Sequence, residues 1–334
     1  MIPKPKHLQS PMKAVQIFAL GHAEFVETPK PELKPGHALI RTHRLSLCGS
    51  DVGMLHHFPE ERYPLLPGTT GHEMVGFIEA IDAPGSFLKA GDLTLTLAPD
   101  HRAMAEYYLA PIENVLPLPP DKPVEELLQA QQLGTVIYAC KTLPNMIGKD
   151  VVVIGQGSAG LWFDFMLRRL GAARIIALDL QAHRLQLSHL YGATHTVHNR
   201  EVDGLTAVTD ITKGQLADIV IEASGEIEAI NLAVDLVKED GHILQFGVPR
   251  SQVVPHNYRQ LFLKRLSLKG IVYATRDPGH ASTHMALDLI ASGAINVAPM
   301  ITHHFPFDRV LEAYELHRTY DEGAVKIVIE MPEG

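Results

Sequence analysis

The sequence predicts an α/β protein of two domains, a β-rich one followed by one built around a doubly wound parallel sheet. Residues 13–110 contain short strand-like runs separated by Gly and Pro, as in a small barrel or sheet domain. From residue 150 to 270, continuous β-branched runs alternate with amphipathic stretches, which is typical of a parallel sheet covered on both faces. The length of 334 residues also agrees with two domains.

Composition excludes several classes of protein. The formal net charge of −9 argues against nucleic-acid and membrane-surface binding, because both need clustered Lys and Arg. The two cysteines, Cys48 and Cys140, exclude a disulfide framework and favour a cytoplasmic location. No apolar run reaches the roughly 18 residues that a membrane span needs. Residues 1–11 lack the apolar segment of a secretory signal and are expected to form a loose extension, with Met12 as an alternative start.

The predicted elements follow one another in a regular order. In the first part, the strand-like runs are KAVQIFAL, HALIRTHRLSL, GHEMVGFIEAI and LTLTLAP, and a helical stretch opens at Asp121 and Pro123. In the second part, the strands DVVVIG, RIIALDL, ADIVIEAS and GHILQFGV are separated by helical stretches. GIVYAT is expected to be a further strand, and a helix and a terminal strand, AVKIVIE, end the chain. We expect one domain at residues 1–132 and 274–334 and the other at 133–273.

Three glycines after the run DVVVI have the spacing of a dinucleotide site. Gly155, Gly157 and Gly160 form G-x-G-x-x-G between a buried strand and a helix, with Ser158 and Ala159 in the last gap. The first glycine permits a tight turn, the second lets the backbone approach a pyrophosphate, and the third lets helix and strand pack closely. The helix N-terminus then faces the phosphates. This context favours a Rossmann-type dinucleotide site over a plain Gly-rich turn.

Asp179 indicates which dinucleotide binds. It closes the next strand, RIIALD, at about the 20-residue distance expected for a ribose-binding carboxylate. A carboxylate there accepts hydrogen bonds from the ribose of NAD and repels the 2′-phosphate of NADP. The alternative is a solvated strand end. Arg184 is expected to pack beside the adenosine, although an arginine can also serve a 2′-phosphate.

Two short motifs of the β-rich part carry residues that bind zinc. CGSD contains Cys48, and GHE contains His72 and Glu73. Thiolate, imidazole and carboxylate are all zinc ligands, and a catalytic zinc keeps three protein ligands and one open position. Spacing alone cannot pair ligands that lie far apart in the sequence. Taken singly, such a Cys is more often a small buried residue, and such a His more often a satisfied polar residue, than a metal ligand.

Taken together and in order, these motifs resemble the zinc-dependent branch of the medium-chain dehydrogenase/reductase family. The resemblance extends from MKAVQIF to KIVIE. It includes CGSD, GHEMVG, AGD, AEYYLAP, VVVIGQGSAG, IEASG, QFGV and FPFDRVLEAYEL. Sorbitol-dehydrogenase-like members are the most similar, because they share CGSD and the GHE pair. The resemblance implies a GroES-like catalytic domain, a Rossmann coenzyme domain and an active site in the cleft between them.

The resemblance also implies roles for the residues of these motifs. Cys48 and His72 are expected to ligate the catalytic zinc, and Glu73 to be a third ligand or a carboxylate beside it. Ser50 falls where the family has a hydroxyl that accepts the substrate proton and passes it on. Asp51 is expected to orient the ligands from outside the coordination sphere.

Two departures from the family pattern concern the metal. Many members hold a second, structural zinc with four closely spaced cysteines, but this region, AGDLTLTLAPDHRAMAEYY, contains none. We therefore expect one catalytic Zn²⁺ and no structural zinc. Where the family often has Cys or Glu before the coenzyme domain, this chain has Gln131, with Gln132 beside it. Gln is a poor zinc ligand that can still hold a water, so the third ligand is either Glu73 or a water held by Gln131.

Further cofactor contacts are implied by family position alone. Each has an ordinary packing role as its alternative. Ser224 is expected near the adenosine, and Lys326 near the pyrophosphate. The segment Phe246, Gly247 and Val248 is expected at the nicotinamide carboxamide, and Tyr273 beside the nicotinamide.

The implied function is hydride transfer between a polyol or secondary alcohol and NAD. His56 and His57 either line the substrate pocket or lie in a surface loop. A homodimer or homotetramer is expected, paired through an edge strand near LSLKGIVYAT. The alternatives are a zinc-free NAD(P)H enone or quinone reductase of the same fold, and a non-catalytic NAD(H)-binding protein.

Overall fold

The computed structural model describes residues 10–272 and 276–332, so the predicted N-terminal extension lies largely outside the described residues. The chain divides into two compact units. The first comprises Met1–Gln131, His303–Thr319 and Ile327–Gly334, and the second Gln132–Thr302 and Tyr320–Lys326. Among the described helices, none is both long and apolar enough to cross a membrane.

The boundary between the units differs from the expected one at the second crossing. The chain returns to the first unit at residue 303, whereas the sequence suggested residue 274. Helix α9 (Ala281–Ala291) stays with the second unit because it packs against α3 (Ala130–Lys141), where a Cβ at Gly134 would lie 2.7 Å from Thr283 Oγ1. The Asp277 carboxylate strengthens this contact, since it accepts from Ser282 N–H at 2.6 Å and lies 3.3 Å from Lys141 Nζ.

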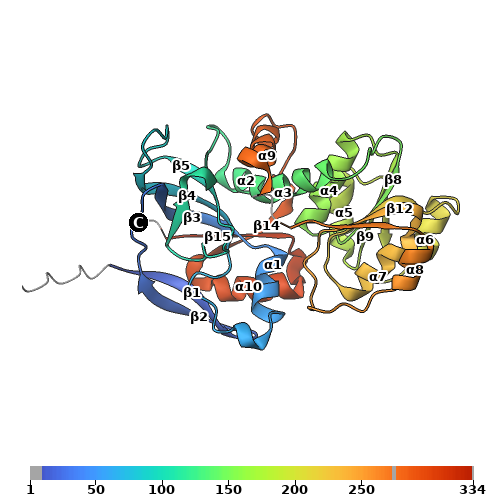
Figure 1. Ribbon diagram of the computed structural model, residues 1–334, viewed down its shortest axis with the longest axis horizontal. Helices are drawn as coiled ribbons and strands as arrows, with labels where there is room; N and C mark the ends of the chain where they lie inside the picture. Colours follow the sequence, from blue (N-terminus) through green and yellow to red (C-terminus); the bar gives the residue numbers. More distant parts are fainter. Residues whose placement is uncertain (1–9, 273–275, 333–334) are drawn as a thin grey trace, which may run out of the picture. The chain divides into compact units, whose positions relative to one another are not determined.

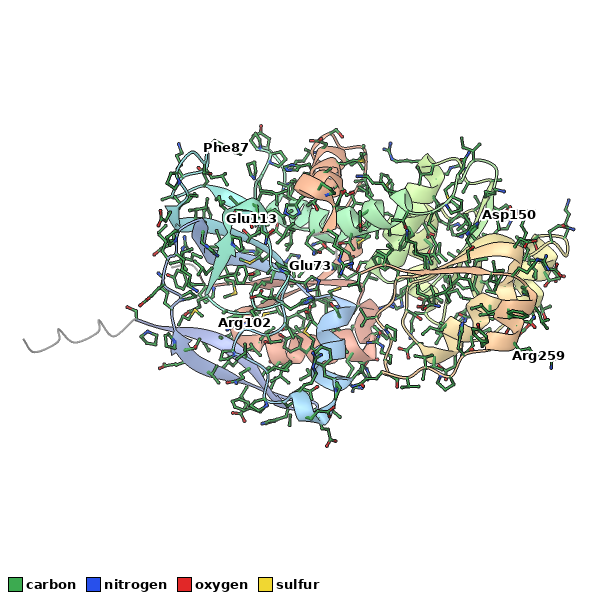
Figure 2. All side chains as sticks on the ribbon, viewed as in Figure 1. Glu73, Phe87, Arg102, Glu113, Asp150 and Arg259 are labelled. Carbon is green, nitrogen blue, oxygen red and sulfur yellow. The ribbon has the colours of Figure 1, made fainter. Side chains whose placement is uncertain are left out.

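The first unit is built on antiparallel strands. A two-stranded sheet pairs β1 (Pro11–Ala19) with β2 (His22–Pro29). A seven-stranded sheet has the order β14 (Ile301–Pro306), β15 (Lys326–Glu330), β3 (His37–Ser46), β4 (Glu73–Asp82), β5 (Leu93–Leu97) and β7 (Val115–Pro117), with β6 (Tyr107–Pro111) also paired to β3. Its helices are α1 (Gly49–His56), α2 (Val124–Leu128) and α10 (Val310–Thr319). Glu73, labelled in Figure 2, is the first residue of β4.

The second unit contains a six-stranded sheet whose described pairings are all parallel. Its order is β10 (His195–His198), β9 (Arg174–Asp179), β8 (Asp150–Ile154), β11 (Ala217–Glu222), β12 (Val237–Gln245) and β13 (Ser267–Gly270). Numbered along the chain, this is the 3-2-1-4-5-6 order of a doubly wound dinucleotide-binding sheet. Ligands bind such sheets at the carboxyl ends of the strands, where the order reverses between β8 and β11. The predicted α/β fold class is confirmed.

Helices cover both faces of the parallel sheet (Figure 1). Helices α4 (Ser158–Arg169) and α5 (Ala182–Tyr191) connect β8, β9 and β10. On the other face, α6 (Gly204–Ile211), α7 (Ile227–Leu236) and α8 (Tyr258–Leu263) pack on one apolar cluster that includes Val152, Ile176, Val220 and Ile243. The β-branched strands are buried because each is covered on two sides. Short 3-10 turns complete the chain at Glu60–Arg62, Ile112–Asn114, Pro278–His280, Ala298–Met300, Phe307–Arg309 and Asp321–Gly323.

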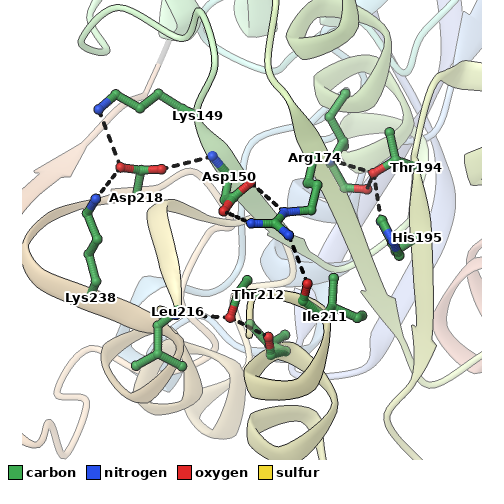
Figure 3. Close-up of polar contacts among 12 residues, drawn as sticks. Lys149, Asp150, Arg174, Thr194, His195, Ile211, Thr212, Leu216, Asp218 and Lys238 are labelled. Atoms are coloured by element: carbon green, nitrogen blue, oxygen red, sulfur yellow. Dashed lines mark hydrogen bonds and ion pairs between the residues drawn. The ribbon is translucent and has the colours of Figure 1, made fainter. Parts of the chain in front are cut away.

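An ion-pair network joins the amino ends of the parallel strands (Figure 3). Arg174, the first residue of β9, donates to both carboxylate oxygens of Asp150 at 2.7 and 2.5 Å, and its third nitrogen reaches the Ile211 carbonyl at 2.9 Å. The Asp218 carboxylate accepts from Asp150 N–H at 2.9 Å and pairs with Lys238 Nζ at 2.5 Å. The network lies at the edge of the sheet opposite the carboxyl ends, so it stabilises the sheet without approaching the glycine-rich turn.

Two predicted elements differ from the structure. The last parallel strand, β13, covers residues 267–270, so the expected strand GIVYAT overlaps it only at Gly270, and residues 273–275 are outside the described part. The single helical stretch expected from Asp121 onwards is divided into α2 and α3. The division falls at Gln129, whose N–H closes the last turn of α2 on the Glu126 carbonyl at 3.1 Å.

Asp164 is an unusual residue of the second unit, because α4 buries its carboxyl completely. Neither carboxyl oxygen has a hydrogen-bond partner among the described residues. Burial without a compensating charge raises the pKa of Asp164 well above its ordinary value. The folded protein therefore keeps a proton on this carboxyl at pH values where the unfolded chain, with an Asp pKa of about 3.9, releases it.

We expect Asp164 to lower the free energy of unfolding as pH rises from about 4 toward the raised pKa of the folded state. Asp164→Asn should remove this decrease. Because the raised pKa belongs to the folded state, the contribution of Asp164 to stability is fully present below about pH 4 and declines by about 1.4 kcal/mol per pH unit above it, until the folded pKa is reached. Urea unfolding of both proteins between about pH 5 and pH 7 measures the difference. Asp288→Asn, on the exposed face of α9, is the control. Parallel curves for wild type and Asp164→Asn would contradict the expectation.

Candidate functional site

Cys48 lies at the start of α1, directly after the buried strand β3. It occupies the N-cap position in extended conformation, with φ −115° and ψ 155°. The Asp51 side chain turns back toward it, and Oδ2 accepts from Cys48 N–H at 2.8 Å. A carboxylate in this position satisfies a backbone donor that the helix leaves unpaired. The thiol is therefore held by a strand on one side and a capped helix on the other.

His72 and Glu73 come from the turn that leads into β4. Gly71 adopts a left-handed conformation with φ +78°, and a Cβ there would lie 2.9 Å from Met104 N. Only glycine fits this position without displacing the backbone. Gly71 N–H donates to Asp51 Oδ1 at 3.1 Å, so the same carboxylate joins this turn to the Cys48 loop.

The structure brings the three predicted metal ligands together. One ligand atom each from Cys48, His72 and Glu73 lies within 4.8 Å of the others, and His72 Nε2 is 4.0 Å from Glu73 Oε1. Glu73 is completely buried, and Cys48 and His72 are half-buried. A thiolate, an imidazole and a carboxylate at this separation match the donor set of a catalytic zinc with three protein ligands. These residues thus fit the ion by chemistry and by distance.

Asp51 sets the electrostatics of the cluster. Burial by itself would raise the pKa of Asp51, but its hydrogen bond and attraction to His72 and the bond from Cys48 N–H lower it to about 2. Burial would lower the pKa of His72, yet Asp51, whose Oδ1 lies 3.5 Å from His72 Nδ1, and Cys48 raise it well above its ordinary value. Asp51 and Cys48 therefore favour positive charge at the His72 ring. An imidazole held at Nδ1 by a carboxylate presents Nε2 to a metal.

The other residues predicted to lie near the metal are found on α1 and at the start of α3. Ser50 lies in the first turn of α1, and its buried Oγ has no hydrogen-bond partner among the described residues. His56 ends α1, and its ring lies against Gly21 in the β1–β2 turn, 3.5 Å from the position of a Cβ there. His57 follows it as the C-cap residue. Gln131 and Gln132 lie in the first turn of α3. The roles of all these residues stay predictions.

His101 was not anticipated by the sequence reasoning. It adopts a left-handed conformation, φ +55°, in the turn after β5, and its ring centroid lies 4.2 Å from that of His72. A ligand atom of His101 is within 4.8 Å of atoms of Asp51 and His72. Burial, followed by the neighbouring His72 charge, lowers the pKa of His101 to about 4. The sequence carried no signal for this contact, because His101 belongs to no metal motif and the region was noted only for lacking cysteines.

The glycine-rich turn of the second unit has the geometry expected for a dinucleotide. Gly155 follows β8 with φ +91°, and Gly157 caps α4. A Cβ at Gly160 would lie 2.0 Å from the Gly155 carbonyl oxygen, so the turn closes onto the helix only with glycine there. Ser158 and Ala159 form the first turn of α4, whose N–H groups point toward the strand ends. Such a terminus is suited to a phosphate.

Asp179 ends β9 beside this turn and is nearly buried. Its carboxylate accepts from Gln156 N–H at 2.6 Å and from Gln181 N–H at 2.7 Å. The side chain thus connects the turns that follow two neighbouring parallel strands. The alternative reading of Asp179 as a solvated strand end does not match this burial. Each carboxylate oxygen retains a further lone pair for a ribose hydroxyl.

Arg184 is held next to the glycine-rich turn by the C-terminal part of the second unit. Its guanidinium lies 4.3 Å from the centroid of the Tyr320 ring, and Nη2 donates to the Ala324 carbonyl at 3.0 Å. Nη1 is 3.9 Å from the position of a Cβ on Gly157. The sequence reasoning did not name Tyr320, because more than a hundred residues separate it from Arg184.

Of the remaining predicted cofactor residues, Ser224 and the segment Phe246–Val248 lie at the carboxyl end of the parallel sheet, and Lys326 lies elsewhere. Ser224 lies beside Gly155, where a Cβ would be 3.0 Å from that of Ser224, and its Oγ donates to Glu222 Oε1 at 2.6 Å. Gly247 packs against the backbone of residues 224–225, which brings the segment Phe246–Val248 to the carboxyl end of the sheet. Lys326 is buried at the start of β15, and Tyr273 lies outside the described residues.

Comparison with protein families assigns both parts of the chain. Residues 34–120 match the family model of the alcohol dehydrogenase GroES-like domain. Residues 160–292 match that of the zinc-binding dehydrogenases. The first match covers the segments that carry the metal-ligand cluster, which consists of Cys48, His72 and Glu73. The second covers most of the parallel sheet.

Curated relatives align over almost the entire chain. The sorbitol dehydrogenase of Gallus gallus is 28% identical, over 95% of this chain and 96% of that protein. The L-threonine 3-dehydrogenase of Bacillus subtilis is 27% identical, over 92% and 95%. The D-arabitol-phosphate dehydrogenase of Enterococcus avium is 26% identical, over 96% and 97%.

Solved structures share the fold. The alcohol dehydrogenase TADH from Thermus sp. ATN1 superposes with a TM-score of 0.80 at 25% identity, covering 96% of this chain and all of that chain. Galactitol-1-phosphate dehydrogenase from Escherichia coli gives a TM-score of 0.80 at 21% identity over 96% of this chain and all of that chain, which shows the fold alone.

The glycine-rich turn supplies a direct test of dinucleotide binding. Gly160→Ala places a methyl group against the Gly155 carbonyl, so the turn must open and its amides move away from the pyrophosphate. We expect the affinity for reduced NAD, measured by calorimetric titration, to fall at least about tenfold. Gly53→Ala is the matched control, because it lies in α1 of the other unit and nothing lies within 4 Å of a Cβ at that position. Equal affinity in the two variants would refute the assignment.

Proposed function

Because the chain belongs to the zinc-type medium-chain dehydrogenase family and is an oxidoreductase acting on CH–OH groups, we propose that it oxidises a polyol or secondary alcohol with NAD as hydride acceptor. The observation that carries the proposal is the convergence of Cys48, His72 and Glu73 within 4.8 Å. Relatives named for sorbitol and for arabitol phosphate favour a polyol among the possible alcohols. The proposed location is the cytoplasm.

Cys48, His72 and Glu73 hold one zinc ion in this proposal. The ion supplies a Lewis acid, which lowers the pKa of an alcohol toward neutrality. A separate structural zinc is not part of the proposal, since the two candidate ligand groups among the described residues share His72. Glu73 is the third protein ligand, because its Oε1 lies 4.0 Å from His72 Nε2 while Gln131 offers only a weakly binding amide.

The residues around the cluster orient the ligands and move the proton. Asp51 holds His72 through Nδ1 and, through the backbone amides of Cys48 and Gly71, fixes the distance between the two ligand loops. Ser50 Oγ, which has no other hydrogen-bond partner among the described residues, would accept the proton that the alcohol releases and pass its own proton on to a histidine or a coenzyme hydroxyl.

The second unit binds the coenzyme in this proposal. The glycine-rich turn and the N-terminus of α4 bind the pyrophosphate, and Asp179 accepts from the adenosine ribose. NAD is favoured over NADP because Asp179 is a nearly buried carboxylate that would face the 2′-phosphate at close range. Arg184 lies against Tyr320 and the Ala324 carbonyl, which suits packing beside the adenosine better than capture of a phosphate.

The proposal extends to a homo-oligomer. The edge strand β13 is exposed along its whole length, with Leu268 45% exposed. Helix α8 carries two further large exposed side chains, Tyr258 at 69% and Phe262 at 68%. An unpaired edge strand is a template for pairing with a second chain. We therefore place the dimer contact at β13, whether the final assembly is a dimer or a tetramer.

The activity is tested with a panel of polyols and secondary alcohols, each with NAD and with NADP. We expect turnover with NAD in zinc-loaded protein, and a loss in Cys48→Ala of at least about 1,000-fold in kcat/KM, because Lewis-acid stabilisation contributes several kcal/mol. Affinity for NAD should stay within about twofold in Cys48→Ala, since that residue belongs to the other unit.

Three results of this panel would overturn parts of the proposal. Unchanged turnover in folded, metal-free protein would replace it with a zinc-free reductase. NAD binding without reduction by any alcohol would indicate a non-catalytic NAD(H)-binding protein. Turnover with NADP alone would show that Asp179 does not select the coenzyme.

The dimer contact is tested by charge at the edge strand. Leu268→Lys is expected to shift the protein from dimer or tetramer to a smaller species in size-exclusion chromatography with light scattering, because a charged side chain blocks strand pairing. Leu190→Lys, at a position 70% exposed on α5, is the control and should leave the mass unchanged. An assembly insensitive to Leu268→Lys would move the contact elsewhere.

A further inference from the structure

We propose that Ser46 is a positioning residue for the metal: its hydroxyl holds one oxygen of Glu73 and thereby presents the other oxygen to the ion. This inference rests on the proposed zinc site and names a residue that belongs to no metal motif. Ser46 is the last residue of β3, two positions before Cys48, and Glu73 is the first residue of β4.

The contact is set by strand register. Ser46 and Glu73 are directly opposite each other in the antiparallel pairing of β3 with β4. Residues in this relation have Cβ atoms about 5 Å apart, a distance that a hydroxyl and a carboxylate can span. Ser46 Oγ donates to Glu73 Oε2, and both side chains have an exposed fraction of 0%.

The backbone around Ser46 cannot shift easily. On its other side β3 pairs with β15, where Val328 lies opposite Ser46. The serine is therefore enclosed between two strands, and its hydroxyl is held at a fixed point. A long Glu side chain has several rotamers, so a fixed donor at one oxygen removes much of that freedom before an ion arrives.

The two oxygens of Glu73 consequently have different surroundings. Oε2 receives the single proton that a serine can donate, whereas Oε1 lies 4.0 Å from His72 Nε2, inside the cluster that includes Cys48. This arrangement favours coordination through Oε1 alone and leaves the remaining position of a four-coordinate zinc open for a substrate. A carboxylate free to rotate could offer both oxygens and close that position.

Ser46 thus acts on Glu73 as Asp51 acts on His72. Each ligand is held by a buried neighbour at the atom that does not face the ion, Nδ1 in His72 and Oε2 in Glu73. Such partners commonly contribute 10- to 100-fold to metal affinity. The contribution matters here because Gln131 stands where a stronger ligand is expected, so Glu73 has to supply the third bond.

The first test is the zinc affinity of Ser46→Ala, measured with zinc alone by competition against a chromophoric chelator. We expect the dissociation constant to rise by about tenfold. The visible spectrum of the cobalt-substituted protein is expected to change as well, because it reports the ligands and their geometry. Thr42→Val is the matched control, since it removes another buried hydroxyl of β3, which donates to the Ala105 carbonyl at 2.7 Å, without touching a ligand.

A second pair of variants keeps the inference testable should Ser46→Ala not fold. Ser46→Thr and Ser46→Val have nearly the same volume and differ in the hydroxyl. We expect the Thr variant to retain zinc affinity and the wild-type cobalt spectrum, and the Val variant to lose both. Equal behaviour of the two variants would overturn the inference.

A double-mutant cycle with Glu73→Ala shows whether Ser46 acts through Glu73. Without that side chain, Ser46→Ala should change zinc affinity by at most about twofold, the usual limit of additivity. A full tenfold effect in the Glu73→Ala background would overturn the inference. The zinc titration of the wild-type protein distinguishes failure of the proposed function from failure of this inference. Absence of zinc binding by the wild type would contradict the proposed function. Tight zinc binding that Ser46→Ala leaves unchanged would contradict the role of Ser46 alone.

Discussion

The metal-ligand cluster depends on one buried carboxylate, that of Asp51. It accepts from the backbone amides of Cys48 and Gly71 and lies 3.5 Å from His72 Nδ1. The pairing of β3 with β4 brings the two ligand loops side by side, and the Asp51 side chain then links their backbones directly. The two backbone amides and the His72 contact satisfy a charge whose burial would otherwise be costly. Its negative charge also favours a cation at the place where the thiol and the imidazole meet.

In the second unit, too, a buried carboxylate joins two turns by accepting from their backbone amides. Asp179 accepts from the amides of Gln156 and Gln181 and so joins the turns after β8 and β9. Glu222 holds the single turn after β11, where its carboxylate accepts from Ser224 and Gly225 N–H. Buried carboxylates therefore organise the loops at the carboxyl ends of the strands, while the ion pairs of Asp150, Arg174 and Asp218 stabilise the amino ends. As a result, the backbone amides at the carboxyl ends of the parallel strands are held in fixed positions.

Three features stand around the proposed metal site. No cysteine-rich lobe follows β5, and the turn after this strand places the His101 ring centroid 4.2 Å from that of His72. Gln131 stands where the family resemblance implies a stronger ligand, and Ser46 Oγ donates to Glu73 Oε2. These three features fit together, because a site with fewer strong ligands relies more on the side chains that hold them. The donor set remains the one that suits zinc.

The sequence by itself determined the parallel sheet, the Gly155–Gly157–Gly160 turn and the candidate ligands, because hydrophobic period and glycine spacing are local properties of the chain. The break at Gln129 and the early strand at Ser267 were missed, since element ends depend on packing more than on period. Only the tertiary structure decided the contacts of Ser46 with Glu73, His101 with His72 and Tyr320 with Arg184. Each joins residues 27 to 136 positions apart. Strand register and turn geometry choose such pairs, and one sequence carries no local signal for either.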